Sequence, residues 1–353
     1  MSTFPASPHP VTKRDLVVIG ASAGGVETLK RVVERLPVDL PAAICIVLHI
    51  APDSPSLLAR ILDRAGPLPC RSAHEAERLE PGCILVAPPD RHLVVEDEHV
   101  HLSVGPRENG HRPAVDVLFR SAASAKNSHV IGVILSGTRG DGALGLAAVK
   151  AAGGAAIVQD PDEALYAGMP SIALARVTVD AVVPSELVAQ TIVAMVKGDD
   201  PPPGARNAEP AHVPADAASG EEGTTICPEC GGVLTERQEA GTSLWQCRVG
   251  HRYSPEGLLD AQALDVEAAM WAAVRALEDR SRLLERMADQ FEPRGQGRSA
   301  RSWREKAQAT REQARTVREA LMRAASLSLT RDEADDVEQE ELDVRRASGG
   351  GAS

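Results

Sequence analysis

The chain contains three uninterrupted apolar segments, each followed at once by a polar or glycine-rich turn. They span residues 16–19, 42–48 and 130–135. Such runs are typical of parallel strands covered on both faces, since neither face of the strand meets water. The pattern predicts an α/β fold with a doubly wound, mostly parallel sheet and helices on both faces. In this arrangement the carboxyl ends of the strands share one edge, where ligands bind.

The first apolar run leads into the sequence Gly20-Ala21-Ser22-Ala23-Gly24-Gly25. A serine in a Gly-x-Ser-x-Gly frame between a strand and a helix is typical of the sharp turn that presents a hydrolytic nucleophile. The same glycines could instead hold a phosphate against the free N–H groups of the helix. Ser22 could also simply cap that helix. Taken alone, the turn favours neither a nucleophile nor an anion-binding loop.

The other two apolar runs bring a histidine and an aspartate to neighbouring strand ends. The second run ends at His49, and the third leads through Ser136 and Gly137 to Asp141. There His49 can take the proton of Ser22, Asp141 can hold the imidazole tautomer, and backbone N–H groups can stabilise an oxyanion. Each residue also has an ordinary interpretation, as a helix cap, a histidine at the edge of the core or a turn residue. The chain order Ser, His, Asp disfavours the α/β-hydrolase fold, in which the order is Ser, Asp, His.

Four ordered motifs within residues 14–197 resemble those of the chemotaxis protein-glutamate methylesterase family, CheB. The motifs are residues 19–25, 48–52, 111–119 and 137–143. The resemblance implies a Ser22, His49 and Asp141 triad that works without a cofactor.

The family's reaction is hydrolysis of γ-glutamyl methyl esters on methylated chemoreceptor helices, with release of methanol, and some members also deamidate receptor glutamines. Members of the family commonly carry an amino-terminal receiver domain, whereas Ser22 lies within the first 25 residues of this chain. We therefore expect the catalytic domain without a receiver domain. Two alternatives stay open: a hydrolase of another ester or amide, and a scaffold that keeps the fold without catalysis.

Two positions depart from the family pattern near the expected oxyanion hole. Thr138 stands where better-known members have a methionine whose backbone N–H helps to build the hole, and Ala23 stands where a hydroxyl residue often follows the nucleophile. Both changes keep the backbone N–H, so Ala23 and Thr138 remain the expected oxyanion residues. Arg112 has two interpretations: an ion pair with Asp116 four residues on, or a place at the rim of the substrate groove.

A set of metal-binding residue types follows a proline-rich stretch. Cys227 and Cys230 are separated by sixteen residues from Cys247, and His251 comes four residues after it. Two such short-spaced pairs are typical of a closed, structural Zn²⁺ site with three thiolates and one imidazole. A redox Cys-x-x-Cys pair is the competing interpretation, but it leaves Cys247 and His251 unexplained. Another metal is also open.

From residue 255 to residue 325 the apolar positions recur at spacings of three and four, with a break at 293–295. This pattern predicts an antiparallel helical hairpin, which we expect to pack on the zinc knuckle, to self-associate, or to bind a methyltransferase or another signalling protein. Between residues 275 and 323 there are 13 Lys or Arg and 8 Asp or Glu, too small an excess for nucleic-acid binding. Residues 331–343 hold eight acids and one base, which is typical of a disordered tail.

These patterns divide the 353 residues into six segments. We expect an N-terminal tail (1–13), a CheB-type domain (14–197), a Pro-rich linker (198–225), a zinc-binding knuckle (226–254), a helical hairpin (255–328) and an acidic tail (329–353). The first residues hold no apolar segment of signal-peptide length, and no 18 apolar residues run together. The expectation is therefore a cytoplasmic protein that does not insert into a membrane. The five histidines 74, 92, 99, 101 and 129 fit no catalytic spacing and are expected on the surface or in loops.

Overall fold

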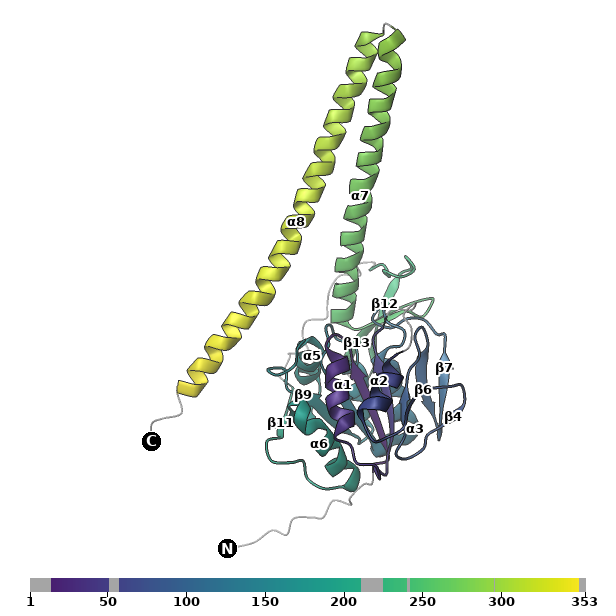
Figure 1. The fold of residues 1–353 in the computed structure, drawn as a ribbon, viewed down its shortest axis with the longest axis vertical. Coiled ribbons are helices and arrows are strands. Elements are labelled where there is room, and N and C mark those ends of the chain that lie inside the picture. Colours follow the sequence, from purple (N-terminus) through teal and green to yellow (C-terminus); the bar gives the residue numbers. More distant parts are fainter. Residues whose placement is uncertain (1–13, 51–56, 211–224, 240–241, 295, 349–353) are drawn as a thin grey trace. The chain divides into compact units, whose positions relative to one another are not determined.

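A computed structural model describes residues 14–50, 57–210, 225–239, 242–294 and 296–348 (Figure 1). The chain forms two compact units, 1–261 and 262–353. The unit boundary therefore falls within a helix and not in the predicted linker. The expected N-terminal tail and residues 211–224 of that linker lie outside the described residues.

The first unit is built on an eight-stranded sheet with the order β11-β10-β9-β8-β1-β2-β5-β3. Neighbouring strands are parallel except β10 and β11. The strands are β1 (Leu16–Ala21), β2 (Ala43–Leu48), β3 (Cys70–Ser72), β5 (Ile84–Val86), β8 (Val130–Ile134), β9 (Ala155–Gln159), β10 (Val179–Val183) and β11 (Arg206–Ala208). The chain winds outward from β1 on one side and from β8 on the other. The topological switch point, where ligands bind in such sheets, therefore lies between β1 and β8.

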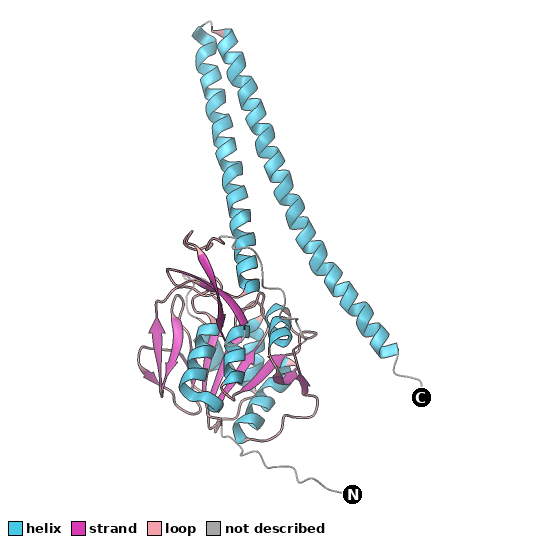
Figure 2. Ribbon diagram, turned by 180° about the vertical axis from the view of Figure 1, so that it is seen from behind, coloured by secondary structure: helices cyan, strands magenta, loops and turns pink. Residues whose placement is uncertain are grey.

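Helices cover both faces of this sheet, as Figure 2 shows. One face carries α1 (Gly25–Glu34), α2 (Leu58–Ala65) and α6 (Ser185–Lys197), and the other carries α3 (Val115–Lys126), α4 (Ala143–Ala151) and α5 (Gly168–Arg176). Alternate residues of β1 pack into opposite cores: Val17 and Ile19 into one, Leu16 and Val18 into the other. The predicted doubly wound, mostly parallel α/β fold is confirmed.

A second, smaller sheet has the strand order β4-β7-β6, with β4 before β5 in the chain and the other two strands after it. Its strands are β4 (Glu77–Arg78), β6 (His92–Glu96) and β7 (His99–Ser103), and a short 3-10 helix, η1 (Asn127–His129), precedes β8. The irregular segment between β7 and α3, residues 104–114, runs past the carboxyl ends of the large sheet's strands toward Asp141. The cysteines expected as small buried hydrophobes, Cys45, Cys70 and Cys83, are buried and carry no disulfide.

The described part of residues 225–261 forms a small module, here called the Cys/His module, within the first unit. It contains β12 (Leu234–Glu239), β13 (Thr242–Cys247) and β14 (Arg252–Tyr253), paired in that order. Its core is made by Cys227, Leu234, Cys247, Tyr253 and Leu258. The module contacts the segment before α3, where the backbone N–H of Asn109 donates to the Arg252 carbonyl at 2.8 Å.

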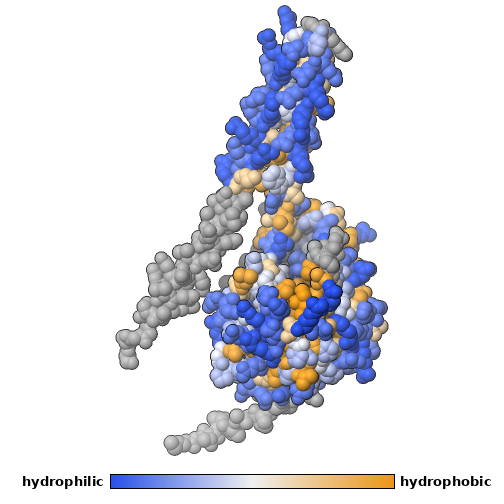
Figure 3. Space-filling model, in the orientation of Figure 1, coloured by the Kyte–Doolittle hydropathy of each residue, from blue (hydrophilic) through white to orange (hydrophobic). Residues whose placement is uncertain are grey.

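The second unit is a helical hairpin. Helix α7 (Pro255–Phe291) enters it from the first unit, and η3 (Glu292–Arg294) and α8 (Gly297–Ser348) follow. The helices run antiparallel, because Ser281 Oγ donates to the Ala307 carbonyl at 3.0 Å while Arg318 pairs with Glu278 further along. Figure 3 shows a mainly hydrophilic hairpin surface. The predicted antiparallel hairpin is confirmed.

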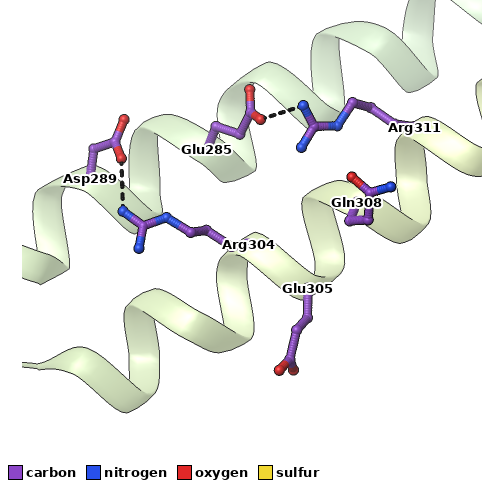
Figure 4. A pocket seen from close by; sticks show the side chains of 6 residues that line it. All are labelled: Glu285, Asp289, Arg304, Glu305, Gln308 and Arg311. Atoms are coloured by element: carbon purple, nitrogen blue, oxygen red, sulfur yellow. Dashed lines mark hydrogen bonds and ion pairs between the residues drawn. The ribbon is translucent and has the colours of Figure 1, made fainter.

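The hairpin also carries a polar cleft, shown in Figure 4. Its ion pairs join Glu285 to Arg311 at 2.7 Å and Asp289 to Arg304 at 3.4 Å. Because the acids and bases neutralise one another and no nucleophile or metal-ligand cluster lines the cleft, we do not place a functional site there. Among the described residues, none of the helices combines the length and apolar composition that a bilayer span requires.

The expected acidic disordered tail, 329–353, is instead part of α8 as far as Ser348. The prediction rested on charge, but net charge alone does not prevent a helix. Residues 298–348 contain neither Gly nor Pro and are rich in Glu, Arg, Ala and Leu, which have high helix propensity. Residues 349–353 lie outside the described residues.

Candidate active site

Ser22 lies in a tight turn between β1 and α1 that has space only for glycine at two positions. A Cβ on Gly20 would lie 2.2 Å from Val115 Cγ1, and one on Gly25 would lie 2.7 Å from Ala21 Cβ. The backbone N–H of Ser22 donates to the Ser136 carbonyl at 3.0 Å, which joins the turn to the end of β8. The N-cap of α1 is Gly24, in the left-handed conformation with φ 71°, so Ser22 does not cap this helix.

The structure brings Ser22, His49 and Asp141 together at the switch point. Ser22 Oγ lies 3.1 Å from His49 Nδ1, and His49 Nε2 lies 2.7 Å from Asp141 Oδ2. The side chains of His49 and Asp141 are 6% and 0% exposed. With Asp141 ionised, Nε2 carries the proton that it donates to the carboxylate, and Nδ1 is free to accept the hydroxyl proton of Ser22. This is the arrangement that activates a serine nucleophile.

Asp141 is held by backbone donors at the N-terminus of α3. The N–H groups of Val115 and Asp116 donate to its two carboxylate oxygens at 2.6 Å and 3.2 Å, and Asn109 Nδ2 donates to Oδ1 at 3.0 Å. Burial opposes ionisation of Asp141, but the hydrogen bond and charge of His49 and the Val115 N–H outweigh it, so the pKa of Asp141 falls below its ordinary value. Asp141 therefore caps α3 and orients His49 with the same carboxylate.

Asp116 is a second buried carboxyl beside Asp141. Its oxygens accept the N–H groups of Gly142 and Gly145 and the amide of Asn109 at 3.0, 2.6 and 3.0 Å, and so join α3 to the start of α4. Burial and the charge of Asp141 raise the pKa of Asp116 to about 8. These three donors occupy the carboxyl group that was expected to face Arg112.

The predicted ion pair between Arg112 and Asp116 is therefore wrong. The rule for residues four apart applies within a helix, and α3 begins only at Val115. Arg112 instead pairs with Asp90 at 2.6 Å and donates to the carbonyls of Val104 and Gly105 at 3.1 and 2.9 Å. It holds the segment before α3 in place, and its contact with a substrate stays a prediction.

His111 packs against His49, a relationship that the spacing of residues did not reveal. The rings of His49 and His111 are stacked, with centroids 3.7 Å apart. Burial and the neighbouring His49 lower the pKa of His111 to about 3, so it is neutral at physiological pH. The third motif of the resemblance contains His111, but nothing in that motif assigns it to His49.

His92 was expected on the surface or in a loop and is instead buried in β6, because its side chain points inward from the small sheet. Its Nε2 lies 3.0 Å from the Pro106 carbonyl, and its Nδ1 accepts the N–H of Ala114 at 3.2 Å. It therefore supports both ends of the segment that carries Asn109 and His111. Burial lowers the pKa of His92.

The two expected oxyanion residues lie on either side of the approach to Ser22. Ala23 follows the serine directly, and its carbonyl accepts the Ser136 hydroxyl at 2.9 Å. Thr138 is exposed and follows Gly137, where a Cβ would lie 2.8 Å from Ser22 Cβ. Their backbone N–H groups as donors to an oxyanion stay a prediction.

The four residues expected to bind metal gather in the Cys/His module. One ligand atom from each of Cys227, Cys230, Cys247 and His251 lies within 4.8 Å of all the others. Cys230 Sγ and Cys247 Sγ are 3.7 Å apart, and His251 Nδ1 lies 3.6 Å from Cys227 Sγ and 3.5 Å from Cys247 Sγ. A tetrahedral site with metal–sulfur bonds of about 2.3 Å has edges of about 3.5–3.8 Å, so the cluster fits a tetrahedral metal ion.

An open parallel sheet with a serine, an imidazole and a buried carboxylate at its switch point defines the class: an α/β protein with the arrangement of a serine hydrolase. Residues 17–192 match the family model described as CheB methylesterase. The chain belongs to this family, and the resemblance found in its motifs is confirmed.

Known proteins of the same kind match this half of the chain. It is 39% identical over 182 residues to a putative protein-glutamate methylesterase/protein-glutamine glutaminase of Leptospira interrogans, covering 51% of this chain and 94% of that protein. It is 37% identical over 191 residues to protein-glutamate methylesterase/protein-glutamine glutaminase 2 of Methanosarcina acetivorans, and it spans about half, 54%, of that longer relative. The crystal structure of the Thermotoga maritima CheB methylesterase catalytic domain matches with a TM-score of 0.50 and 32% identity, over 52% of this chain and 100% of that one.

Proposed function

We propose that this chain is a protein-glutamate methylesterase that hydrolyses γ-glutamyl methyl esters on methylated chemoreceptor helices. The observation that carries the proposal is the continuous path of hydrogen bonds from Ser22 through His49 to Asp141, at 3.1 and 2.7 Å. The names of the relatives, protein-glutamate methylesterase/protein-glutamine glutaminase, support this substrate class. The backbone-bound Asp141 and the stacked neutral His111 support the same role, because both contact His49 and favour one orientation of its ring.

In the proposed mechanism, Ser22 Oγ attacks the ester carbonyl while His49 Nδ1 takes the hydroxyl proton. The tetrahedral oxyanion accepts hydrogen bonds from the backbone N–H groups of Ala23 and Thr138. When the carbon–oxygen bond to the methoxy group breaks, His49 returns the proton and methanol leaves. A water molecule then attacks the acyl-enzyme with His49 as base, and Ser22 is released together with a glutamate carboxylate. Throughout, Asp141 holds the Nε2 proton and stabilises the imidazolium.

The same steps convert a glutamine side chain into glutamate, with ammonia in place of methanol as the leaving group. The relatives carry the glutaminase name as well, which supports this second activity. A scaffold that keeps the fold without catalysis is the alternative from a different class. The intact hydrogen-bond path through Ser22, His49 and Asp141 argues against it.

The test is release of methanol from a methylated chemoreceptor by the purified chain. We expect Ser22→Ala to lower the rate by at least about 10³-fold, as removal of a triad nucleophile does. Ser124→Ala is the matched control, since Ser124 is exposed on α3, and its rate should equal that of the unaltered chain. If the chain turns over only unrelated esters or amides, the substrate is wrong; if it turns over none, the scaffold alternative holds.

We also propose that Cys227, Cys230, Cys247 and His251 hold a structural Zn²⁺. Four protein ligands leave no open position for substrate, and the ion would connect the 227–230 turn to the end of β13. We expect purified chain to contain about one zinc ion, and Cys230→Ser to lose most of it, by elemental analysis. Metal-free chain with a Cys227–Cys230 disulfide would support the redox alternative instead.

A further inference from the structure

Asn109 connects the Cys/His module to the catalytic aspartate. Its amide group donates to Asp141 Oδ1 and Asp116 Oδ2, both at 3.0 Å, while its Oδ1 accepts the backbone N–H of Ser254 at 2.9 Å. Asn109 is 4% exposed, and both N–H donors and the oxygen of its side-chain amide are hydrogen-bonded. One amide thus touches the triad carboxylate with one end and the module with the other.

The module binds the backbone of Asn109 as well as its side chain. The Asn109 N–H donates to the Arg252 carbonyl at 2.8 Å, and Glu108 and Arg252 form a parallel β-bridge. Asn109 has φ 50°, in the left-handed region that asparagine adopts more readily than most residues, and the surrounding contacts fix it in this conformation. Two of those contacts come from module residues adjacent to the ligand His251.

Helix α7 closes the other side of this amide. A Cβ on Gly257 would lie 2.4 Å from Asn109 Oδ1 and 3.0 Å from its Cγ, so only glycine leaves space for Asn109 at this position. Ser254 Oγ accepts the Gly257 N–H at 3.0 Å and fixes the first turn of α7 against Asn109. Nearby, Glu256 at the start of α7 pairs with Arg176 of α5, which anchors the same turn to the large sheet.

We infer that Asn109 is a positioning residue for the triad and that the Cys/His module sets its orientation. The module is thus a built-in part of the active site and not only a docking element. This inference rests on the proposed role of Ser22, His49 and Asp141. It assigns Asn109 no contact with substrate: Asn109 acts by orienting Asp141, which orients His49.

Asn109→Gly and Gly257→Ala test the link from its two sides. Glycine accepts the left-handed backbone at 109 and removes the amide, whereas alanine at 257 displaces the amide although alanine is the better helix former. We expect both variants to lower kcat about 10- to 100-fold, the range for a hydrogen bond to a charged group, with KM changed less than about twofold. Gly297→Ala, with open space at the start of α8, is the control for a glycine-to-alanine change in a helix and should leave kcat unchanged.

Proton NMR of the imidazole N–H that His49 shares with Asp141 gives a readout that does not depend on turnover. The resonance is assigned by its loss in His49→Gln. We expect it to shift or broaden in Asn109→Gly and Gly257→Ala, and also in the full chain after zinc is removed with a chelator and reductant, returning when Zn²⁺ alone is added.

These measurements separate the inference from the proposed function. If the resonance responds but no methyl ester is hydrolysed, the positioning link stands and the substrate is wrong. An unchanged resonance and unchanged kcat in both variants would overturn the link, even if the melting temperature falls, since that result describes a purely structural contact. If the resonance changes in Asn109→Gly but does not change when zinc is removed, the role of the module is overturned.

Discussion

The imidazole of His111 lies flat against that of His49, with the two ring planes inclined by 7°. When two imidazole rings stack at this distance, a positive charge on one ring disfavours a positive charge on the other. When His49 takes the proton of Ser22 it becomes the charged ring, so His111 must stay neutral. The lowered pKa of His111, about 3, meets this condition.

The first prediction follows from this lowered pKa. The folded chain keeps His111 neutral down to about pH 3, whereas the unfolded chain protonates it near the ordinary histidine pKa of 6.5. Between these values the unfolded state binds more protons, so this residue's contribution to stability is fully present above pH 6.5 and is lost as pH falls toward 3. We expect His111→Phe, which retains the flat ring, to lose less stability than the unaltered chain between about pH 7 and pH 5.

Urea unfolding at several pH values measures this effect. The unfolding free energy of His111→Phe should still depend on pH, because the pKa of the buried His92 is also lowered. Exposed His74→Phe is the control and should follow the unaltered chain. If the unfolding free energy of His111→Phe and that of the unaltered chain depend on pH in the same way, His111 is protonated in the folded state over this pH range.

The second prediction concerns the backbone N–H of Thr138. Thr138→Pro removes this donor, and Thr138→Met changes only an exposed side chain. If the N–H stabilises the oxyanion, its loss lowers kcat about 10²- to 10³-fold. In the methanol-release assay, we expect the factor by which Thr138→Pro lowers kcat to be at least about ten times the factor for Thr138→Met. Equal losses would remove Thr138 from the oxyanion hole.

The third prediction concerns the close approach of Gly137 to Ser22. A Cβ at Gly137 would lie 2.2 Å from Met169 Sδ and 2.8 Å from Ser22 Cβ, whereas one at Gly140 would meet nothing closer than 3.4 Å. We expect Gly137→Ala to destabilise the first unit by about 1–3 kcal/mol and to lower turnover, because overpacking displaces the serine. Gly140→Ala, in the same loop, should change the unfolding free energy by less than about 1 kcal/mol. Thermal unfolding of both variants checks this difference.

The fourth prediction concerns the hairpin. Ala307 is 0% exposed and its carbonyl accepts the Ser281 hydroxyl, so the two helices are close at this point. Ala307→Leu should destabilise the hairpin by about 1–3 kcal/mol, since there is no space for a larger side chain. Arg304→Ala should cost less stability than Ala307→Leu, although Arg304 pairs with Asp289 and Glu292, because its side chain is 48% exposed and water screens these ion pairs. A larger effect of Arg304→Ala, measured by the loss of helical circular dichroism on heating, would contradict this order.

The sequence predicted the residues whose position depends on the parallel sheet. Val17, Ile46 and Val133 belong to continuous apolar runs, which form buried parallel strands. These strands place Ser22, His49 and Asp141 at neighbouring strand ends. The spacing of the three cysteines and His251 similarly predicted that these four side chains gather in one place. In both cases a local pattern determines the geometry.

Asn109 and His111 could not be found in this way. They lie in an irregular segment without periodicity, and contacts distant in sequence hold that segment in place. The donor to Asn109 Oδ1 is Ser254, 145 residues away, and the partner of His111 is the ring of His49. Neither residue follows an apolar run or belongs to a recognisable spacing, so a single sequence carries no signal for these pairs.

The buried charge on Asp141 also affects how the proposed reaction ends. The methyl ester is neutral, but the proposed product is a γ-carboxylate formed at Ser22, with the His49 ring between it and the Asp141 carboxylate, which is 0% exposed. Like charges repel more strongly where water is excluded, so the product is held less tightly than the substrate. Arg112 does not offset this, since Asp90 already neutralises it at 2.6 Å. In the proposed reaction, we therefore expect the carboxylate that orients His49 also to favour release of the product.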